Sequence, residues 1–304
     1  MKAFGGNTQK QMVLIATLGS EPQVVTAAYD LLLQQGFSPS LVKILHTTGG
    51  DPKVDRAVKD LRRELKTCLA ANLETSFHPL KTPGGQYLGD VDSPEAVQVY
   101  FQALYRLVWQ EKRAGRQVHL SIAGGRKTMA VYGMAVAQLL FDEADSLWHL
   151  FSGGDFLSSR RMHPLPGDVV RLVQIPVIPW SSITPVLSNL KDVDDPYRAL
   201  ERVNRLQLHE KYESARVFVL GQLTPAERRV AACLAQEGLS DAAIAERLFI
   251  SPRTVEQHLR SAYAKAELHW QLEKVTRSQL ITLLQYYFST RIGEIPDGRR
   301  SQTG

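Results

Sequence analysis

Cysteine is scarce in this sequence, and no apolar run is long enough to span a bilayer. The two cysteines, Cys68 and Cys233, fall in different predicted domains. They provide neither a metal-ligand spacing nor a disulfide framework, which excludes a disulfide-rich secreted protein and fits a reducing cytoplasm. The first eleven residues also lack the apolar core of a signal peptide. We therefore expect a cytoplasmic protein with no metal, no cofactor and no membrane partner.

A strong charge bias is missing as well. Lys and Arg number 36 against 31 Asp and Glu, an excess of five, and the pI is near 9.1. Hydrophobic residues make up 44% and charged residues 22%, an ordinary globular composition. The length of 304 residues is enough for two domains. The small basic excess favours anionic partners without identifying one.

Apolar runs alternate with helical periodicity from residue 12 to about residue 178. Strands are predicted over 12–18, 41–45, 74–78, 118–123, 146–151 and 169–177, with a turn at 160–168. Helices are predicted between them, at about 24–32, 51–70, 93–113 and 129–141. This order indicates βαβ units, so the predicted fold class is α/β with a Rossmann-like, mostly parallel sheet.

The strand predicted to end at residue 123 is followed by a glycine turn. Gly124 and Gly125 lead into Arg126, Lys127 and Thr128, and an apolar helical pattern comes next. Glycine allows a ligand to approach the backbone, and a helix start offers free N–H groups that suit a phosphate. The turn is not a Walker loop, because an arginine stands where that motif needs glycine. It is therefore either a phosphate site or a plain turn with two solvated cations.

Two further loops leave predicted strands and carry candidate ligand residues. Gly19 and Ser20 follow the first strand, and Thr47 and Thr48 follow the second. In parallel sheets such loops converge at a switch in strand order, which favours a ligand site over a plain turn. The alternatives are a helix cap at Ser20 and simple turn roles for the two threonines.

The pattern changes after Pro179. Residues 180–189 are rich in Ser, Thr and Pro, and a charged stretch ends at Pro196, so the domain boundary is predicted here. A polar stretch over 199–215 predicts a connector helix that could pair with a second copy. The predicted division is a flexible leader 1–11, an α/β domain 12–178, a linker and connector helix 179–222, a smaller all-α domain 223–290 and a flexible tail 291–304.

Three short helices are predicted after residue 223. Thr224, Pro225 and Glu227 have the spacing of a capping box, and Ser251 is placed to cap the third helix. The second helix is predicted over 241–248 and the third from 252 to about 266. Two short helices joined by a tight turn form a helix-turn-helix, whose second helix enters the major groove of DNA.

The third helix presents a polar face opposite its apolar residues Val255, Leu259 and Ala262. The candidate DNA contacts on or beside that face are Arg253, Thr254, Glu256, Gln257, His258 and Arg260. Arg and Gln suit purine edges, and Arg also suits phosphates. A solvated helix face is the alternative. Residues 222–265 hold six Lys or Arg against five Asp or Glu, which predicts weak non-specific DNA affinity.

The helical segment resembles a LuxR-type helix-turn-helix over about residues 223–288. The resemblance is carried by Leu223-Thr224-Pro225-Ala226-Glu227-Arg228-Arg229-Val230 and by Ile244-Ala245-Glu246-Arg247-Leu248-Phe249-Ile250-Ser251-Pro252-Arg253-Thr254-Val255-Glu256-Gln257-His258-Leu259. It implies binding to double-stranded DNA as a dimer, with Thr254, Val255 and His258 at family positions. Two departures are Glu256, where the family often has lysine, and a longer link over 269–276.

The α/β domain resembles a CARF domain, nearest to the CRISPR-associated ring nuclease branch, over about residues 12–178. The resemblance is carried by Thr17-Leu18-Gly19-Ser20-Glu21-Pro22-Gln23-Val24-Val25 and by Gly124-Gly125-Arg126-Lys127-Thr128-Met129. It implies a homodimer that binds cyclic oligoadenylate, often the tetramer, across its two-fold axis. It also implies cleavage of that ring without a metal.

The resemblance and the chemistry of the ring together assign expected roles. Lys127 is expected to stabilise the pentavalent phosphate charge, and Ser20 to orient the attacking ribose 2′-OH or the phosphate. Gly125, Arg126 and Thr128 are expected to hold the phosphate, and Gly19 and Gly124 are further expected ligand-binding residues. Thr47 and Thr48 are weaker candidates for base or ribose contacts.

Three functions remain open from the sequence. The first is a ring nuclease that also regulates transcription, producing linear products with 2′,3′-cyclic phosphate ends. The second is a cyclic-oligoadenylate-responsive transcription factor without cleavage. The third is a sensor of a different nucleotide.

Overall fold

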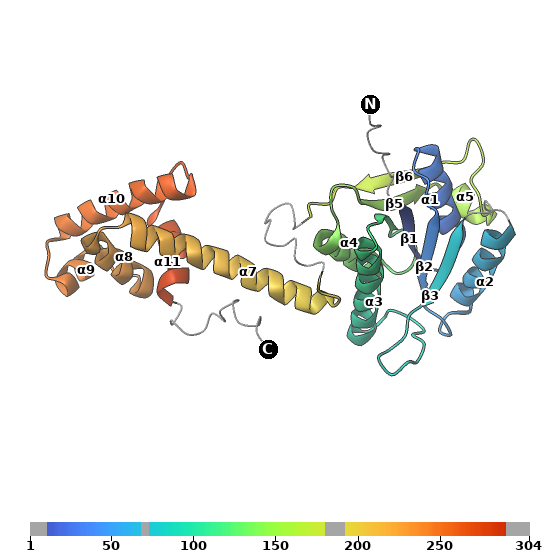
Figure 1. Cartoon of the computed structure of the whole chain (residues 1–304), viewed down its shortest axis with the longest axis horizontal. Coiled ribbons are helices and arrows are strands. Elements are labelled where there is room, and N and C mark those ends of the chain that lie inside the picture. Colours follow the sequence, from blue (N-terminus) through green and yellow to red (C-terminus); the bar gives the residue numbers. More distant parts are fainter. Residues whose placement is uncertain (1–10, 68–72, 180–191, 290–304) are drawn as a thin grey trace, which may run out of the picture. The chain divides into compact units, whose positions relative to one another are not determined.

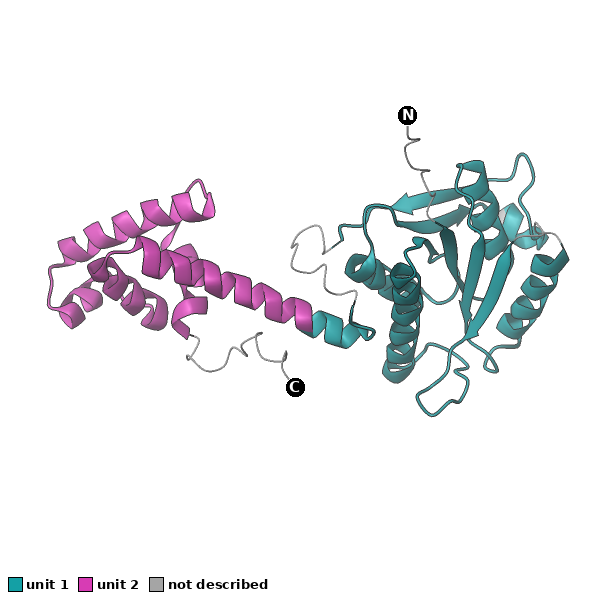
Figure 2. Cartoon of the chain, in the orientation of Figure 1, with its two compact units in different colours: residues 1–201 teal, residues 202–304 magenta. Residues whose placement is uncertain are grey.

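A computed structural model describes residues 11–67, 73–179 and 192–289. The chain forms two compact units, Met1–Glu201 and Arg202–Gly304, called here the sheet unit and the helical unit (Figure 2). The predictions for residues 1–10, Cys68, the 180–189 boundary stretch and the tail after residue 289 lie outside the described residues. Gln11, expected in the leader, joins the fold because its carbonyl accepts a hydrogen bond from the Gln117 N–H at 3.0 Å.

The sheet unit holds a six-stranded sheet in the order β3-β2-β1-β4-β5-β6. The strands are β1 (Met12–Leu18), β2 (Leu41–His46), β3 (Glu74–Pro79), β4 (Gln117–Ser121), β5 (Ser146–Ser152) and β6 (Val170–Ile175). The first five run parallel, and β6 pairs antiparallel with β5. This confirms the predicted α/β fold class. The strand order reverses between β1 and β4.

Helices cover both faces of the sheet. The helices are α1 (Gln23–Gln34), α2 (Pro52–Thr67), α3 (Pro94–Arg113) and α4 (Lys127–Leu140). Figure 1 shows α1 and α2 on one face and α3 and α4 on the other. Residues Val13, Leu14 and Ile15 of β1 are therefore buried whichever way they point, which explains the unbroken apolar run in the sequence.

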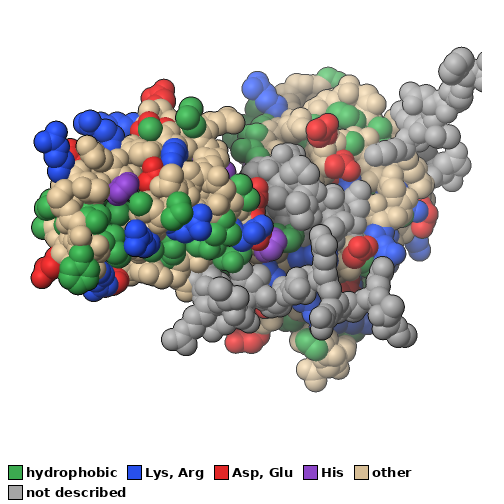
Figure 3. All heavy atoms as spheres, turned by 60° about the vertical axis from the view of Figure 1, so that its left-hand side comes forward, with side chains coloured by type: hydrophobic (Ala, Val, Ile, Leu, Met, Phe, Trp, Pro, Cys, Tyr) green, Lys and Arg blue, Asp and Glu red, His purple; other side chains and the backbone are tan. Residues whose placement is uncertain are grey.

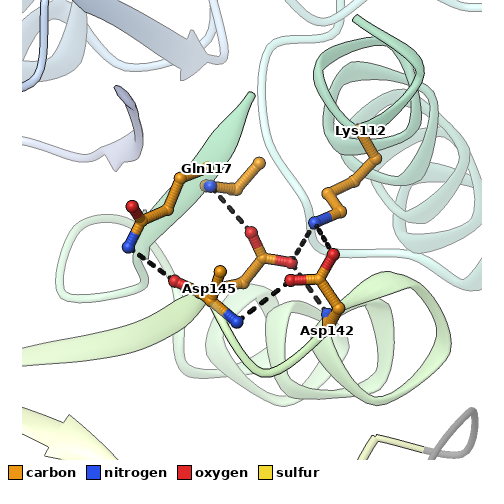
Figure 4. Close-up of polar contacts among 6 residues, drawn as sticks. Lys112, Gln117, Asp142 and Asp145 are labelled. Carbon is orange, nitrogen blue, oxygen red and sulfur yellow. Dashed lines mark hydrogen bonds and ion pairs between the residues drawn. The ribbon is translucent and has the colours of Figure 1, made fainter. Parts of the chain in front are cut away.

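A buried ion-pair network holds the end of the sheet where β4 and β5 begin. Lys112 Nζ lies 2.7 Å from Asp142 Oδ2 and 2.5 Å from Asp145 Oδ2 (Figure 4). The other Asp145 oxygen accepts from the Val118 N–H at 2.8 Å, and Gln117 Nε2 donates to the Ala144 carbonyl at 2.6 Å. The charges satisfy one another at the edge opposite the predicted ligand loops, so we read this network as structural.

Several predicted boundaries were wrong. Strand β6 ends at Ile175, two residues before its predicted end. A helix, α5 (Gly154–Ser159), precedes the predicted turn, and its six residues are too few to show a helical period. Strand β4 ends at Ser121, two residues early. Helix α10 (Pro252–Trp270) runs past the predicted end because the Trp270 and Phe218 rings pack at 4.7 Å between centroids. The link to the next helix is correspondingly shorter than predicted.

The helical unit is built around one apolar core. Its elements are the greater part of α7 (Pro196–Val217), the π-helix η2 (Phe218–Gln222), α8 (Pro225–Glu237), α9 (Asp241–Leu248), α10 and α11 (Arg277–Ser289). Helix α7 covers the predicted connector. The predicted caps are confirmed: Thr224 Oγ1 accepts from the Glu227 N–H at 3.3 Å, Glu227 Oε2 accepts from the Thr224 N–H at 2.8 Å, and Ser251 Oγ accepts from the Thr254 N–H at 3.1 Å.

A buried histidine makes the sheet unit sensitive to acid. His119 on β4 is fully buried, accepts a hydrogen bond at Nδ1 from Trp148 Nε1 at 3.1 Å, and has no hydrogen-bond partner at Nε2 within the described ranges. Burial lowers the pKa of His119 to about 4. The histidine of the unfolded chain binds a proton below about pH 6.5, whereas His119 in the folded protein stays neutral. The free energy of unfolding is therefore highest above that pH and falls by about 3 kcal/mol in total as the pH drops towards 4.

The variant His119→Gln tests this effect, because glutamine accepts from Trp148 but does not titrate. Urea unfolding at pH 7 and pH 4 should show a smaller loss of unfolding free energy in the variant than in the unchanged protein. Carboxylates contribute equally to both proteins, and His209→Gln on the exposed side of α7 is the matched control. Equal losses in all three proteins would contradict the assignment.

Candidate functional site

The loops after β1 and β4 meet where the strand order reverses. The two strands are adjacent and parallel, with Ala16 opposite Ser121, so their carboxyl ends lie side by side. Thr17 Oγ1 donates to the Gly124 carbonyl at 2.6 Å and joins the two loops. In open parallel sheets this crevice is the usual ligand position.

The glycines of these loops leave no room for side chains. A Cβ on Gly124 would lie 2.1 Å from the Thr17 carbonyl oxygen, and one on Gly19 would lie 2.7 Å from the Gly125 nitrogen. Gly125 also has a φ of +88°, which an L side chain rarely adopts. The motif glycines are therefore explained by loop-on-loop packing, whether or not a ligand binds.

A hollow of about 490 Å³ opens beside this contact; we call it the glycine hollow. Six predicted site residues line it: Gly19, Ser20, Thr47, Gly124, Gly125 and Arg126. Five residues that were not predicted as site residues also line it: Glu21, Asp51, Gly89, Asp90 and Ser152. Gly89 and Asp90 come from the loop between β3 and α3. The backbones of Gly50 and Gly89 pack closely, which places that loop beside the glycine hollow. In the sequence, the glycines at these positions are the only signal of this contact.

The only cation lining the glycine hollow among the described residues is already paired. Arg126 Nε lies 2.5 Å from Asp90 Oδ1, and a second guanidinium nitrogen contacts Asp90 Oδ2. This hydrogen bonding lowers the pKa of Asp90. Glu21, Asp51 and Asp90 also line the hollow, so its fixed charge is less favourable to a phosphate than the sequence alone suggested.

Lys127 and Thr128 do not face the glycine hollow. They line an adjoining hollow of about 1060 Å³, together with Val91, Gln98, Tyr132 and Tyr197. Gly125 and Arg126 line both hollows. The predicted catalytic pair, Ser20 and Lys127, is thus divided between two neighbouring hollows within one chain.

Two alternative roles are settled by hydrogen bonds. No side chain caps α1, whose first turns use the Glu21 and Pro22 carbonyls, so Ser20 is not a helix cap. Thr48 donates its N–H to the Leu88 carbonyl at 3.0 Å and bonds His46 Nδ1 through its hydroxyl at 3.1 Å. Thr48 therefore acts as a turn residue, whereas Thr47 reaches the hollow.

The recognition helix α10 presents the side chains predicted for DNA contact. Val255, Leu259 and Ala262 are buried, as predicted. The exposed residues of the candidate set are Arg253, Glu256, Gln257 and Arg260, and the half-buried ones are Thr254 and His258. An arginine and amide face in this position is suited to the major groove.

A buried carboxylate fixes α10 against α8. Glu227 Oε2 lies 2.6 Å from Lys265 Nζ and also accepts from the Thr224 N–H. Burial alone would raise the pKa of Glu227, but hydrogen bonds from Lys265, Ser261 and Thr224 outweigh it and lower the pKa to about 2. The helix-turn-helix is therefore rigidly built at neutral pH.

The helical unit also exposes apolar surface. Figure 3 turns this unit towards the viewer and shows hydrophobic side chains with Lys and Arg among and beside them. Exposed large apolar side chains of the unit include Leu208, Val217, Leu220, Phe249, Leu268 and Leu272. Phe249, 95% exposed, stands at the turn between α9 and α10. Single exposed apolar side chains are normal on a protein surface, so these residues by themselves do not mark an interaction site.

The fold and the motifs define a chain that joins a mostly parallel α/β sheet to a helix-turn-helix domain. Comparison with known families agrees at both ends. Residues 21–208, more than half of the chain, match the family described as CRISPR-associated protein NE0113, and the chain belongs to that family. Residues 221–276 match the LuxR family of bacterial regulatory proteins, so the chain carries a LuxR-type DNA-binding domain.

Curated relatives match a short segment of the chain. Proteins of Mycobacterium bovis and Mycobacterium tuberculosis, each named an HTH-type transcriptional regulator, are 58% identical to this chain over 48 residues. The matched segment is 16% of this chain and 5% of each relative, so the chain spans only a small part of their length.

The described residues show no feature of a membrane span or of a metal site. No helix there is long and apolar enough to cross a membrane. No group of three or more His, Cys, Asp or Glu side chains there is arranged to hold a metal ion.

Proposed function

We propose that this protein is a nucleotide-responsive regulator of a CRISPR system, with cyclic oligoadenylate, in particular cyclic tetra-adenylate, as its ligand. Two copies would hold the ring across their shared two-fold axis, so that each loop meets the ring twice. The observation that carries the proposal is the crevice between β1 and β4, where the glycine loops and the start of α4 converge.

The start of α4 supports an anionic ligand. Arg126 is the N-cap and Lys127 the first helical residue, and the first turn has no acidic residue. Cations are unfavourable beside the positive end of a helix dipole. Asp90 already compensates Arg126, whereas Lys127 forms no ion pair with a described residue, so a phosphate at the free N–H groups would supply the counter-charge of Lys127.

We further propose that the ring is cleaved. A ribose 2′-OH would attack the adjacent phosphorus and lose its proton to water, the bond from phosphorus to the 5′ oxygen would break, and that oxygen would take a proton from water. The products are a 2′,3′-cyclic phosphate and a 5′-OH. Lys127 would stabilise the pentavalent charge, and Ser20 would orient the attacking group. Since Ser20 and Lys127 line different hollows of one chain, the dimer would have to bring a Lys127 to the reacting phosphate.

A second candidate, a ligand-responsive regulator without cleavage, is favoured by that same separation of Ser20 from Lys127. In either case, the change in DNA-binding free energy caused by the ligand equals the difference in ligand-binding free energy between the DNA-bound and the free protein.

Incubation with cyclic tetra-adenylate in EDTA separates the two candidates. We expect linear products by chromatography, with Lys127→Ala slowing the reaction about 100-fold to 1000-fold and Ser20→Ala about 100-fold. Lys66→Ala, an exposed lysine on α2, is the control and should keep the original rate. If the ring stays intact, the proposal of ring cleavage fails. Unchanged rates in both site variants would show that other residues perform the cleavage.

A further inference from the structure

A second hollow, of about 410 Å³, shares Ser20 and Glu21 with the glycine hollow. Its other walls come from the start of α1, one face of α2 and the chain after α5, elements that lie together in Figure 1. We call it the cationic hollow, after the four basic residues that line it: Lys53, Arg56, Arg63 and Arg160.

The walls of the cationic hollow are held in place by hydrogen bonds. Gln23 Nε2, at the start of α1, donates to the Leu157 carbonyl of α5 at 3.1 Å. Thr26 on α1 bonds the Met162 carbonyl, and His163 Nδ1 lies 2.7 Å from Asp30 Oδ2. The hollow is therefore preformed, as small-molecule sites usually are.

Of the carboxylates that line the cationic hollow, only Asp60 pairs with a permanent cation, Arg63, at 3.0 Å. Glu21 accepts a hydrogen bond from the neutral amide of Gln23 at 2.9 Å, and Glu64 lies 3.3 Å from His163 Nε2 without a hydrogen bond to it.

Three cations of the cationic hollow have no ion-pair partner among the described residues. Lys53, Arg56 and Arg160 form no ion pair with any described residue, and all three are exposed. Lys53 and Arg56 are three apart on α2 and so share a face. Four basic side chains thus line the hollow with three carboxylates, and an anion entering it would meet the three cations that no described carboxylate pairs with.

Arg160 ends α5 with a φ of +54°, in the left-handed region that favours glycine or asparagine. Phe249 and Gln271 end α9 and α10 with nearly the same φ, so this kind of helix end recurs in the chain. What assigns Arg160 to the cationic hollow is that it lines the hollow.

The two adjoining hollows have complementary chemistry. Apolar side chains in the glycine hollow, among them Val24, Val54 and Leu150, suit the face of a base. Its carboxylates Glu21 and Asp51 are suited to accept hydrogen bonds from ribose hydroxyls.

We propose that a nucleotide with a free terminal phosphate binds across both hollows, with the base and ribose in the glycine hollow and the phosphate in the cationic hollow. The choice of adenine as the base rests on the proposed function, whereas the phosphate position does not. This site shares the glycine hollow with the proposed ring site, whereas the cationic hollow is not lined by the start of α4, and a closed ring has no terminal phosphate to place there.

Calorimetric titration of the full chain with AMP tests the proposal. We expect saturable binding, and a loss of at least about 10-fold in the triple variant Lys53→Ala/Arg56→Ala/Arg160→Ala. The control Lys59→Ala/Lys66→Ala/Arg171→Ala removes the same charge from exposed positions outside the hollow and should bind AMP normally. Arg160→Gly alone should weaken AMP binding without lowering the melting temperature, because glycine accepts the positive φ.

Cyclic tetra-adenylate, titrated in parallel, separates this proposal from the proposed function. Its affinity should be the same for the triple variant and the control. If AMP does not bind, or binds the triple variant as tightly as the control, the cationic hollow is not a phosphate site, even if the ring binds. If AMP binds as expected and the ring does not, the terminal-phosphate site stands and the cyclic-oligoadenylate proposal fails.

Discussion

The double variant Arg253→Ala/Arg260→Ala should bind its DNA operator about 100-fold more weakly than the unchanged protein. Both side chains are exposed on the face of α10 opposite its buried residues, and neither forms an ion pair within the described part of the chain. Each contact to a base edge or phosphate contributes roughly 1–3 kcal/mol, and positions two helical turns apart should add. An operator selected from random duplexes, titrated by fluorescence anisotropy at one salt concentration, gives the measurement.

The matched control is Arg205→Ala/Arg216→Ala on α7, which removes the same charge from exposed positions. Its affinity should stay within about two-fold, because distant exposed charges act only through the screened field. Equal losses in the two double variants would show that charge alone matters and that α10 does not read DNA. Repeating the titration with cyclic tetra-adenylate present shows whether the ligand changes DNA affinity.

Gly124→Ala should destabilise the sheet unit by about 3 kcal/mol or more. The new Cβ would lie 2.1 Å from the Thr17 carbonyl oxygen and 2.9 Å from its carbonyl carbon. Both atoms belong to the backbone of the central strand β1, so relief requires the strand or the glycine turn to move. Hydrogen exchange followed by mass spectrometry can report the two units separately. Protection should fall in β1 and β4 and remain in α8 to α10.

Gly84→Ala is the control for this substitution. Gly84 has no positive φ, and its Cβ would meet nothing closer than Thr82 Oγ1 at 3.8 Å. Its effect should be within about 0.5 kcal/mol. If Gly124→Ala proved as stable as this control, the close packing of the β1 and β4 loops would be wrong, and with it the geometry of the glycine hollow.

Much of the site could be predicted because its signals are local. The glycine turn before Arg126 and the Gly19-Ser20 pair were recognisable from composition and from the strands that precede them. The position of Lys127 in the neighbouring hollow could not be predicted, because it depends on the direction that the side chains of the first turn of α4 take in the folded protein. Asp90 was missed because its loop has no periodicity, and it reaches Arg126, 36 residues later, only through the folded sheet.

The sequence by itself determined the α/β alternation, the helix caps of the helix-turn-helix and the buried face of α10. Each is a matter of spacing between near neighbours, which sets burial and capping directly. Tertiary structure alone decided which charges meet. It paired Arg126 with Asp90, divided Ser20 from Lys127, and placed Arg160 in the hollow with Lys53 and Arg56. Those pairings follow from strand order and from the packing of loops far apart in the chain, which no local spacing encodes.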